Sequence, residues 1–129
     1  MQDFKKLRVW DESIGLAADV YKTTAQMPRE EIYGLIAQMR SAVVSISSNI
    51  AEGSGRASSA DKARFFQIAI GSASELESQL LVGRRLGMLG DIEMLVDHVD
   101  KVRRQLISLR DRVERTTLFC HTPLVASSP

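Results

Sequence analysis

The segment EGSGR, residues 52–56, is where phosphate chemistry would first be sought in this sequence. Glycine-rich loops and helix N-termini present backbone N–H groups that bind phosphate. A phosphate-binding loop of the Walker type, however, follows a β-strand and ends in Gly-Lys followed by Ser or Thr. Here the segment follows a helical pattern and continues from Arg56 into Ala and Ser. We therefore interpret it as a connection between two helices and predict no phosphate or cofactor site.

The other reactive side chains do not form an arrangement suited to catalysis or metal binding. His98 and His121 have no cysteine or acidic partners at metal-ligand spacing, and Cys120 lies beside His121 in a segment without helical period. Glu75 and Glu77 are two positions apart, so they point to different faces of a helix. The serine-rich helices lack a histidine to activate a nucleophile. The sequence predicts a non-enzymatic protein with no catalytic residue, metal ligand or small-molecule substrate.

Polar residues around the same connection predict a structural network. Asn49, Glu52 and Arg56 lie near the end of one helical segment, and Ser72 and Glu75 lie on the next. If the two sets face each other, Glu52 or Glu75 accepts from the Arg56 guanidinium, and Asn49 and Ser72 satisfy the remaining groups. Such a buried pair adds specificity more than stability. An ordinary solvated charged face is the alternative, and the pattern does not choose between them.

Four segments with a helical period position these residues. The first covers about residues 5–25, and the second begins at Pro28 and runs to about residue 52. The third follows a capping box at Ser58 and ends near Gly87, and the fourth runs from Ile92 to Val113. Short connections make sequential helices antiparallel. The prediction is an all-α, up-down-up-down antiparallel four-helix bundle over residues 1–115, followed by a flexible tail at 116–129.

The apolar residues also predict which faces are buried. On the first helix the expected core stripe is Leu7, Trp10, Ile14, Ala17 and Tyr21. On the third helix the expected stripe is Phe66, Ala69, Ala73, Leu76 and Leu80, and on the fourth it is Ile92, Leu95, Val99, Val102, Leu106, Leu109 and Val113. Several apolar residues fall outside the core stripes and favour contact with a second subunit, although a wide core-facing stripe explains them equally well. They are Val9, Leu16 and Val20 on the first helix and Phe65, Ile68, Ile70 and Leu81 on the third.

Two glycines carry expectations of their own. Gly53 is expected to end the second helix in a left-handed conformation. Gly71, inside the third helix, is expected to mark a close helix crossing, because glycine costs about 1 kcal/mol relative to alanine at such a position.

Composition narrows the classes of protein. The 129 residues suit a single domain, and 17 basic against 16 acidic residues give a formal charge of +1, which provides no strong overall field for nucleic acid. One cysteine and the lack of a long apolar run predict a cytoplasmic protein with no membrane partner.

The stretch from Ser45 to Leu80 resembles a known family. It resembles the signature of small bacterial four-helix proteins related to the protein encoded by intervening sequences in 23S ribosomal RNA genes, also called S23. The opening FKKLRVWDESIGLAADVYKTT and the later LLVGRRLGML extend the resemblance over about residues 4–113. One departure is Ser47, where many relatives carry proline. Matching positions are Ser48, Asn49, Ile50, Ala51, Glu52, Gly53, Gly55, Arg56, Ala69, Gly71, Ser72, Glu75, Leu76 and Glu77.

The resemblance implies a four-helix bundle that assembles into a homopentameric ring. A distant relative of that architecture is the basic, pentameric accessory protein of diversity-generating retroelements, which binds nucleic acid and reverse transcriptase. Two hypotheses for function follow. In the first, the protein is a homo-oligomeric scaffold that docks a protein partner through apolar surface.

In the second hypothesis, the protein is an accessory protein that binds RNA or DNA through basic residues of the fourth helix and the loop before it. Interleaved acidic residues make an ordinary solvated face the favoured interpretation of this set. The candidate residues are Arg84, Arg85, Lys101, Arg103, Arg104, Arg110, Arg112 and Arg115.

Overall fold

The computed structural model describes the backbone of residues 3–126 and the side chains of residues 3–116. Four α-helices form the chain: α1 (Arg8–Thr24), α2 (Leu35–Ser54), α3 (Ser59–Arg85) and α4 (Glu93–Ala126). Two single-turn 3-10 helices, η1 (Phe4–Lys6) and η2 (Arg29–Glu31), precede α1 and α2. No strand occurs in the described backbone, so the predicted all-α class is confirmed.

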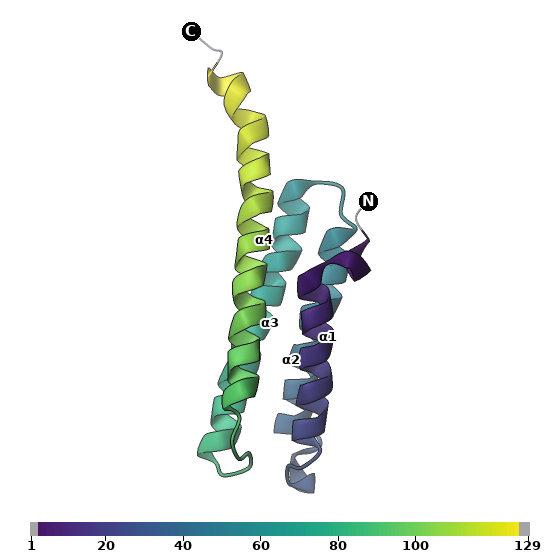
Figure 1. Cartoon of the computed structure of the whole chain (residues 1–129), viewed down its shortest axis with the longest axis vertical. Coiled ribbons are helices and arrows are strands. Elements are labelled where there is room, and N and C mark those ends of the chain that lie inside the picture. Colours follow the sequence, from purple (N-terminus) through teal and green to yellow (C-terminus); the bar gives the residue numbers. More distant parts are fainter. Residues whose placement is uncertain (1–2, 127–129) are drawn as a thin grey trace.

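The helices run up and down in sequence order, so that each is antiparallel to its neighbour (Figure 1). Each helix packs against the next, and α4 closes the bundle against α1, whereas diagonal helices make no close backbone approach. The closing seam between α1 and α4 is the least extensive of the four. The predicted four-helix bundle is confirmed.

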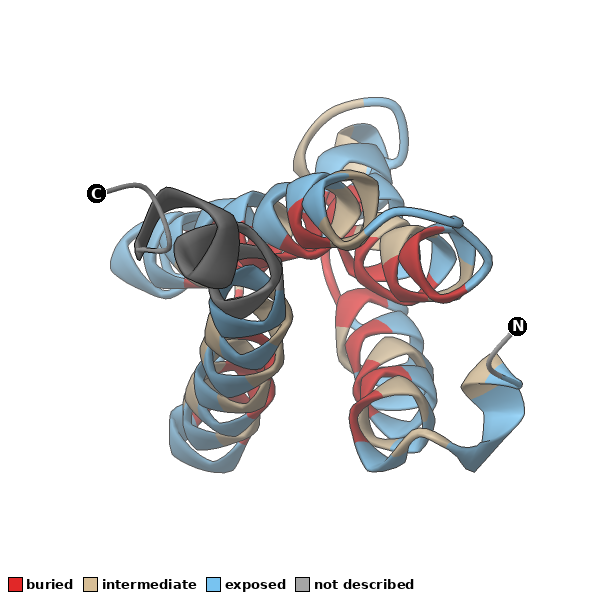
Figure 2. Ribbon diagram, turned by 90° about the horizontal axis from the view of Figure 1, so that it is seen from above, coloured by how far each residue is buried: buried red, intermediate tan, exposed pale blue. Residues whose placement is uncertain are grey.

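The core follows the expected stripes on α3 and α4. Phe66, Ala69, Ala73, Leu76 and Leu80 of α3 are all buried. Val99, Val102 and Leu106 of α4 are fully buried opposite them. Viewed from above, the buried positions of all four helices face inward (Figure 2).

The predicted core face of α1 is partly wrong, because Leu7, Trp10 and Ala17 pack half-buried against the core but Ile14 and Tyr21 do not. Val9, Leu16 and Val20 are buried in the common core, whereas Ile14 is 40% and Tyr21 43% exposed. Two apolar stripes compete on this helix, and the buried one includes the polar residues Ser13 and Thr24. Their hydroxyls donate to carbonyls of their own helix, Ser13 to Trp10 at 2.6 Å and Thr24 to Val20 at 2.7 Å. Because these hydroxyls are satisfied locally, they enter the core at little cost.

The second helix begins later than expected. Pro28 precedes the 3-10 turn Arg29–Glu31, and α2 begins only at Leu35. Gly34 breaks the helix with φ −109° and ψ −115°, and the Glu31 carboxylate accepts from the Leu35 N–H at 3.0 Å. The predicted continuous helix from Pro28 is therefore wrong over its first turns.

The glycines act differently from the predictions. Gly53 lies inside α2 and does not have positive φ, so it is not a left-handed stop. A Cβ at Gly53 would lie 2.9 Å from Phe66 Cε1 and 3.0 Å from Phe65 Cβ, so glycine permits close approach of α2 and α3. Gly71 is exposed and a Cβ there would meet nothing, so the expected crossing at Gly71 is wrong. Gly87, with φ +73°, follows the end of α3 as expected.

Helix α4 continues beyond the boundary expected at residue 115. It extends to Ala126 and projects past the end of the other helices (Figure 1). The segment 116–126 is thus helical, whereas the expectation gave it no period. The side chains of Cys120 and His121 lie outside the described residues.

Substitution of the two glycines by alanine should have opposite effects. Gly53→Ala forces its methyl group against Phe66 and should lower the free energy of unfolding by about 1–3 kcal/mol. Gly71→Ala is the matched control in open space and should raise it by about 0.5–1 kcal/mol, because the unfolded chain loses freedom. Urea unfolding followed by circular dichroism measures both. Equal effects of the two substitutions would contradict a close approach at Gly53.

Candidate functional site

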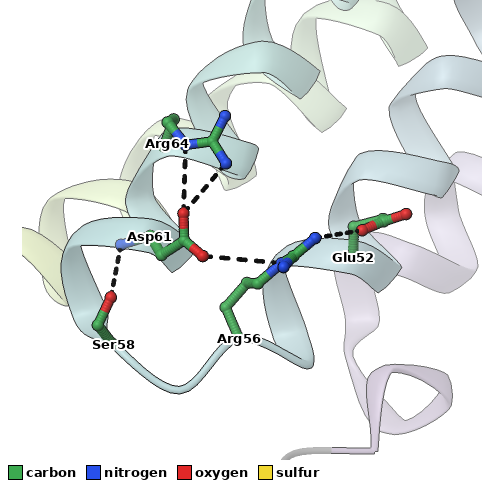
Figure 3. Close-up of polar contacts among 5 residues, drawn as sticks. All are labelled: Glu52, Arg56, Ser58, Asp61 and Arg64. Atoms are coloured by element: carbon green, nitrogen blue, oxygen red, sulfur yellow. Dashed lines mark hydrogen bonds and ion pairs between the residues drawn. The ribbon is translucent and has the colours of Figure 1, made fainter.

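The α2–α3 connection carries a compact charged cluster (Figure 3). Ser58 caps α3 by accepting from the Asp61 N–H at 3.1 Å, as the capping box predicts. The Asp61 carboxylate pairs with Arg64 at 3.1 Å and lies 3.7 Å from Arg56 Nε. Arg56 also donates to Glu52 at 2.8 Å, across one helical turn. The segment EGSGR therefore comprises the end of α2 and the start of the turn to α3, and Arg56 links the two helices through its ion pairs.

Phe65 provides the apolar part of this cluster. The guanidinium carbons of Arg56 and Arg64 each lie 4.5 Å from the centre of its ring. A cation over a phenylalanine face contributes about 0.5–1 kcal/mol at an exposed site. Both arginines are more than 40% exposed, so they are held in place while their charges remain in water.

The predicted polar network is divided into three separate groups. Asn49 donates to the Ser45 carbonyl at 2.8 Å, and the Ser45 hydroxyl lies 2.9 Å from that of Ser72, which joins α2 to α3. Glu52 holds Arg56 at the connection, and both side chains are exposed rather than buried.

Glu75 forms the third group, because it accepts from Gln79 one turn along α3 at 3.1 Å and does not reach Arg56. The prediction that these residues form one buried network is therefore wrong. Sequence reasoning missed Ser45 and Asp61, although Asp61 stands at the spacing from Arg64 that favours an ion pair.

Most of the basic residues expected to bind nucleic acid have carboxylate partners. Arg103 donates to Glu77 of α3 and, at 2.8 Å, to Asp100. These hydrogen bonds, chiefly the one to Glu77, raise the pKa of Arg103. Arg104 lies 3.0 Å from Asp100, and Lys101 lies 3.1 Å from Glu12 of α1. These partners neutralise the middle of α4.

The other members of that set lie towards the ends of the bundle. Arg110 donates to Gln67 of α3 and lies 2.9 Å from Asp111, and Arg84 lies 3.9 Å from Glu93. Among the described side chains, no ion pair involves Arg85, Arg112 or Arg115. The expected set is thus not one continuous basic face.

A cluster of polar side chains, called here the polar clasp, joins α1 to α4, whose contact is the least extensive in the bundle. Glu12 of α1 lies between His98 Nε2 at 2.8 Å and Lys101 Nζ at 3.1 Å, both on α4. The hydrogen bond with His98, then that with Lys101, lowers the pKa of the Glu12 carboxyl. Sequence reasoning did not predict this clasp, because its members are more than 80 positions apart.

The described residues form neither a metal-binding group nor a membrane span. No group of three or more His, Cys, Asp or Glu side chains among them could hold a metal ion. Within the same residues, no helix has the length and apolar character to cross a membrane. An apolar hollow of about 490 Å³ lies on the outer face of α3 and includes Leu81, Val82 and Leu86.

The fold and the α2–α3 connection match a described family. The family model for the 23S rRNA-intervening sequence protein matches residues 5–108. The chain belongs to the 23S rRNA-intervening sequence protein family. The resemblance seen in the motif from Ser45 to Leu80 is thereby confirmed.

A solved structure supports the same fold for this family member. The crystal structure of a protein with unknown function from the S23 ribosomal protein family of Bacteroides thetaiotaomicron matches with a TM-score of 0.73. The match has 23% identity and covers 80% of this chain and 95% of that chain. A comparison with curated proteins finds no match. At this identity, the structural likeness establishes the fold only.

Removal of the Glu12 charge should weaken the bundle in a pH-dependent way. Because its pKa is lowered in the folded protein, the ionised carboxylate stabilises the fold above the ordinary glutamate pKa of about 4.3. This stabilisation is lost as the pH falls through the lowered pKa. Glu12→Gln should therefore cost about 1 kcal/mol at pH 7 and progressively less as the pH falls below the ordinary glutamate pKa.

Chemical unfolding across this pH range measures the difference, with Glu30→Gln as the control. Glu30 is exposed and no ion pair involves it within the described side chains. A cost of Glu12→Gln that is the same at pH 3 and pH 7 would show that the carboxylate charge is not the cause.

Arg56→Ala should have only a small effect on stability. Arg56 is exposed, so its loss removes surface ion pairs and one cation–π contact worth together about 1 kcal/mol. Leu76→Ala, in the core, should cost about 2–5 kcal/mol. Thermal unfolding of the two variants compares them directly, and a loss for Arg56→Ala as large as for Leu76→Ala would indicate a buried role.

Proposed function

We propose that this family member is a non-enzymatic, homo-oligomeric scaffold that assembles through the outer face of α3. This α3 face is defined by Ile68, Leu81, Val82 and Leu86, which are between 37% and 60% exposed. Soluble proteins rarely leave several large apolar side chains together on one helix face unless that face has a partner. This exposed apolar face is the observation that carries the proposal.

The shape of the α3 face is suited to close helix packing. Gly71, Ser74 and Ser78 are exposed on the same helix, and Ser74 and Ser78 line the shallow hollow together with Leu81 and Val82. Small side chains between large apolar ones let another helix approach closely, with the larger residues filling the hollow. A second copy of the chain has the same need to cover this face.

Only some of the apolar residues expected at a subunit interface are exposed. Ile68 and Leu81 are exposed and remain candidates, whereas Val9, Leu16, Val20 and Ile70 are buried within the chain. Ile14 and Tyr21 of α1 and Val44 of α2 are exposed apolar residues on two neighbouring helices. Contact between them and the α3 face of another copy would be head-to-tail and would close into a ring when the rotation permits.

Five copies is the ring size implied by the family resemblance. The remaining partner is a protein of unknown identity, and we place the assembly in the cytoplasm. That placement rests on the single cysteine, which suits a reducing compartment.

Light scattering coupled to size-exclusion chromatography tests the assembly. Five chains of 14.3 kDa should give about 72 kDa, whereas a monomer gives the mass of one chain. Leu81→Glu combined with Val82→Glu should lower the mass to that of the monomer, because burial of unpaired charge at an interface is costly.

The control is a pair of glutamates on an exposed polar face, Gln38→Glu with Ser41→Glu. It should keep the oligomeric mass, and circular dichroism should show the same helix content in both variants. A monomeric mass for the unmodified chain at micromolar concentration would refute self-association.

A further inference from the structure

The charges of the chain are segregated along the bundle axis. One end, called here the loop end, comprises the α2–α3 connection with the start of α3, residues 110–115 of α4, and η1. Figure 1 shows the N-terminus and the α2–α3 connection at this end, with α4 passing beyond them. The bond between Arg110 and Gln67 ties this part of α4 to the start of α3.

The loop end carries an excess of cations. Its carboxylates are five: Asp3, Glu52, Asp61, Asp111 and Glu114. Its cations are eight: Lys5, Lys6, Arg56, Lys62, Arg64, Arg110, Arg112 and Arg115. The difference is an excess of three positive charges at one end of a chain whose formal charge is +1.

The opposite end lacks this cationic excess. The α1–α2 and α3–α4 connections and the adjoining turns hold five cations against six carboxylates, where Arg40 belongs to this end because it bonds to Thr24 and stacks on Tyr21. The cations are Lys22, Arg29, Arg40, Arg84 and Arg85, and the carboxylates are Asp19, Glu30, Glu31, Asp91, Glu93 and Asp97. The remaining charges along the middle are four cations and five carboxylates, so the middle is nearly neutral.

Ion pairing sharpens the contrast between the loop end and the middle of α4. Lys101, Arg103 and Arg104 each have a carboxylate partner. At the loop end, Arg56, Arg64 and Arg110 share Glu52, Asp61 and Asp111. Among the described side chains, no ion pair involves the other five cations there, which are Lys5, Lys6, Lys62, Arg112 and Arg115. Four of these five are exposed, and Lys62 is half-buried.

The length of the bundle keeps the two ends electrostatically independent. A helix of 27 residues, such as α3, is about 40 Å long. The Debye length at physiological salt is about 8 Å, so the carboxylates of the opposite end do not cancel the field at the loop end. A polyanion therefore meets the local excess rather than the small net charge.

We propose that the loop end binds the phosphodiester backbone of nucleic acid without reading its sequence. Five of its eight cations are arginines, whose guanidinium groups form paired hydrogen bonds with phosphate oxygens. Phe65 is covered by Arg56 and Arg64, so its ring is not available to stack on a base. Contact with phosphates alone gives affinity that does not depend on sequence.

This surface exists in a single chain, and the proposed ring would multiply it. A cyclic assembly places equivalent ends of all subunits on the same side. The loop ends would then form one basic face, whereas the opposite ends would not. The multiplication rests on the proposed function, whereas the binding surface of one chain does not.

Neutralisation at the two ends of the bundle provides the test. Lys62→Gln, Arg112→Gln and Arg115→Gln together remove three charges from the loop end. Lys22→Gln, Arg29→Gln and Arg84→Gln remove the same number from the opposite end and are the matched control. Binding is measured by fluorescence anisotropy with labelled single-stranded RNA and double-stranded DNA of mixed sequence, at about 50 and 200 mM salt.

The unmodified chain should bind both probes at about 50 mM salt and lose at least tenfold in affinity at about 200 mM. The loop-end variant should bind at least tenfold more weakly and show a smaller salt dependence, whereas the control should stay within about twofold. Failure of the unmodified chain to bind, or equal losses in both variants, would overturn the proposal. Polyglutamate that competes as well as unlabelled RNA would overturn the assignment to nucleic acid.

Light scattering on the same samples separates this proposal from the proposed self-association. The loop-end variant should keep the mass of the unmodified chain while its binding falls. The Leu81→Glu and Val82→Glu variant should still bind nucleic acid as a monomer, with reduced affinity. Loss of binding without a change in mass identifies the loop end alone, and a monomeric mass with retained binding refutes only the ring.

Discussion

The close approach of α2 and α3 at Gly53 is the constraint on which the rest of the structure depends. Without a side chain at this position, the last turn of α2 lies against Phe65 and Phe66 of α3. That contact fixes the angle at which the chain turns back over residues 55–58. It also brings Arg56 within reach of Asp61 and over the ring of Phe65. The charged cluster at the connection is therefore a consequence of packing, and the ion pairs themselves are too exposed to create it.

The sequence was sufficient to predict the fold wherever one apolar stripe dominated a helix. The expected stripe of α3, from Phe66 to Leu80, is buried, and so is that of α4 from Ile92 to Leu106. On α1, the stripes through Ile14 and through Leu16 are both regular, and apolar character alone favoured the wrong one. The buried face was the one whose polar members, Ser13 and Thr24, satisfy their own hydroxyls within the helix. Helix periodicity does not contain this information, because it depends on which side of α1 meets its neighbours.

The candidate site was predictable by residue type but not by partner. Asn49, Glu52, Arg56, Ser72 and Glu75 all make polar contacts, yet no contact joins them into one network. Pairs one turn apart, such as Glu52 with Arg56 or Asp100 with Arg104, follow from spacing on a helix. Pairs between helices, such as Glu12 with His98 or Arg103 with Glu77, require the rotation of both helices about their axes. A small error in that rotation changes the partner, and for this reason the sequence left Glu52 and Glu75 as alternative partners of Arg56, of which Glu52 accepts from Arg56 and Glu75 accepts from Gln79.

Net charge is a poor guide to the partners of a long, thin bundle. It sums charges that lie several Debye lengths apart, and in this chain the sum hides an excess of three positive charges at one end. The two ends are built differently, since the loop end contains the close α2–α3 contact and the continuation of α4, while the other end contains two longer connections rich in carboxylates. A side-by-side assembly through the α3 face would leave both ends free, because that face runs along the bundle rather than across its end. Self-association and polyanion binding would therefore use different surfaces of the same four helices, so the two can occur together.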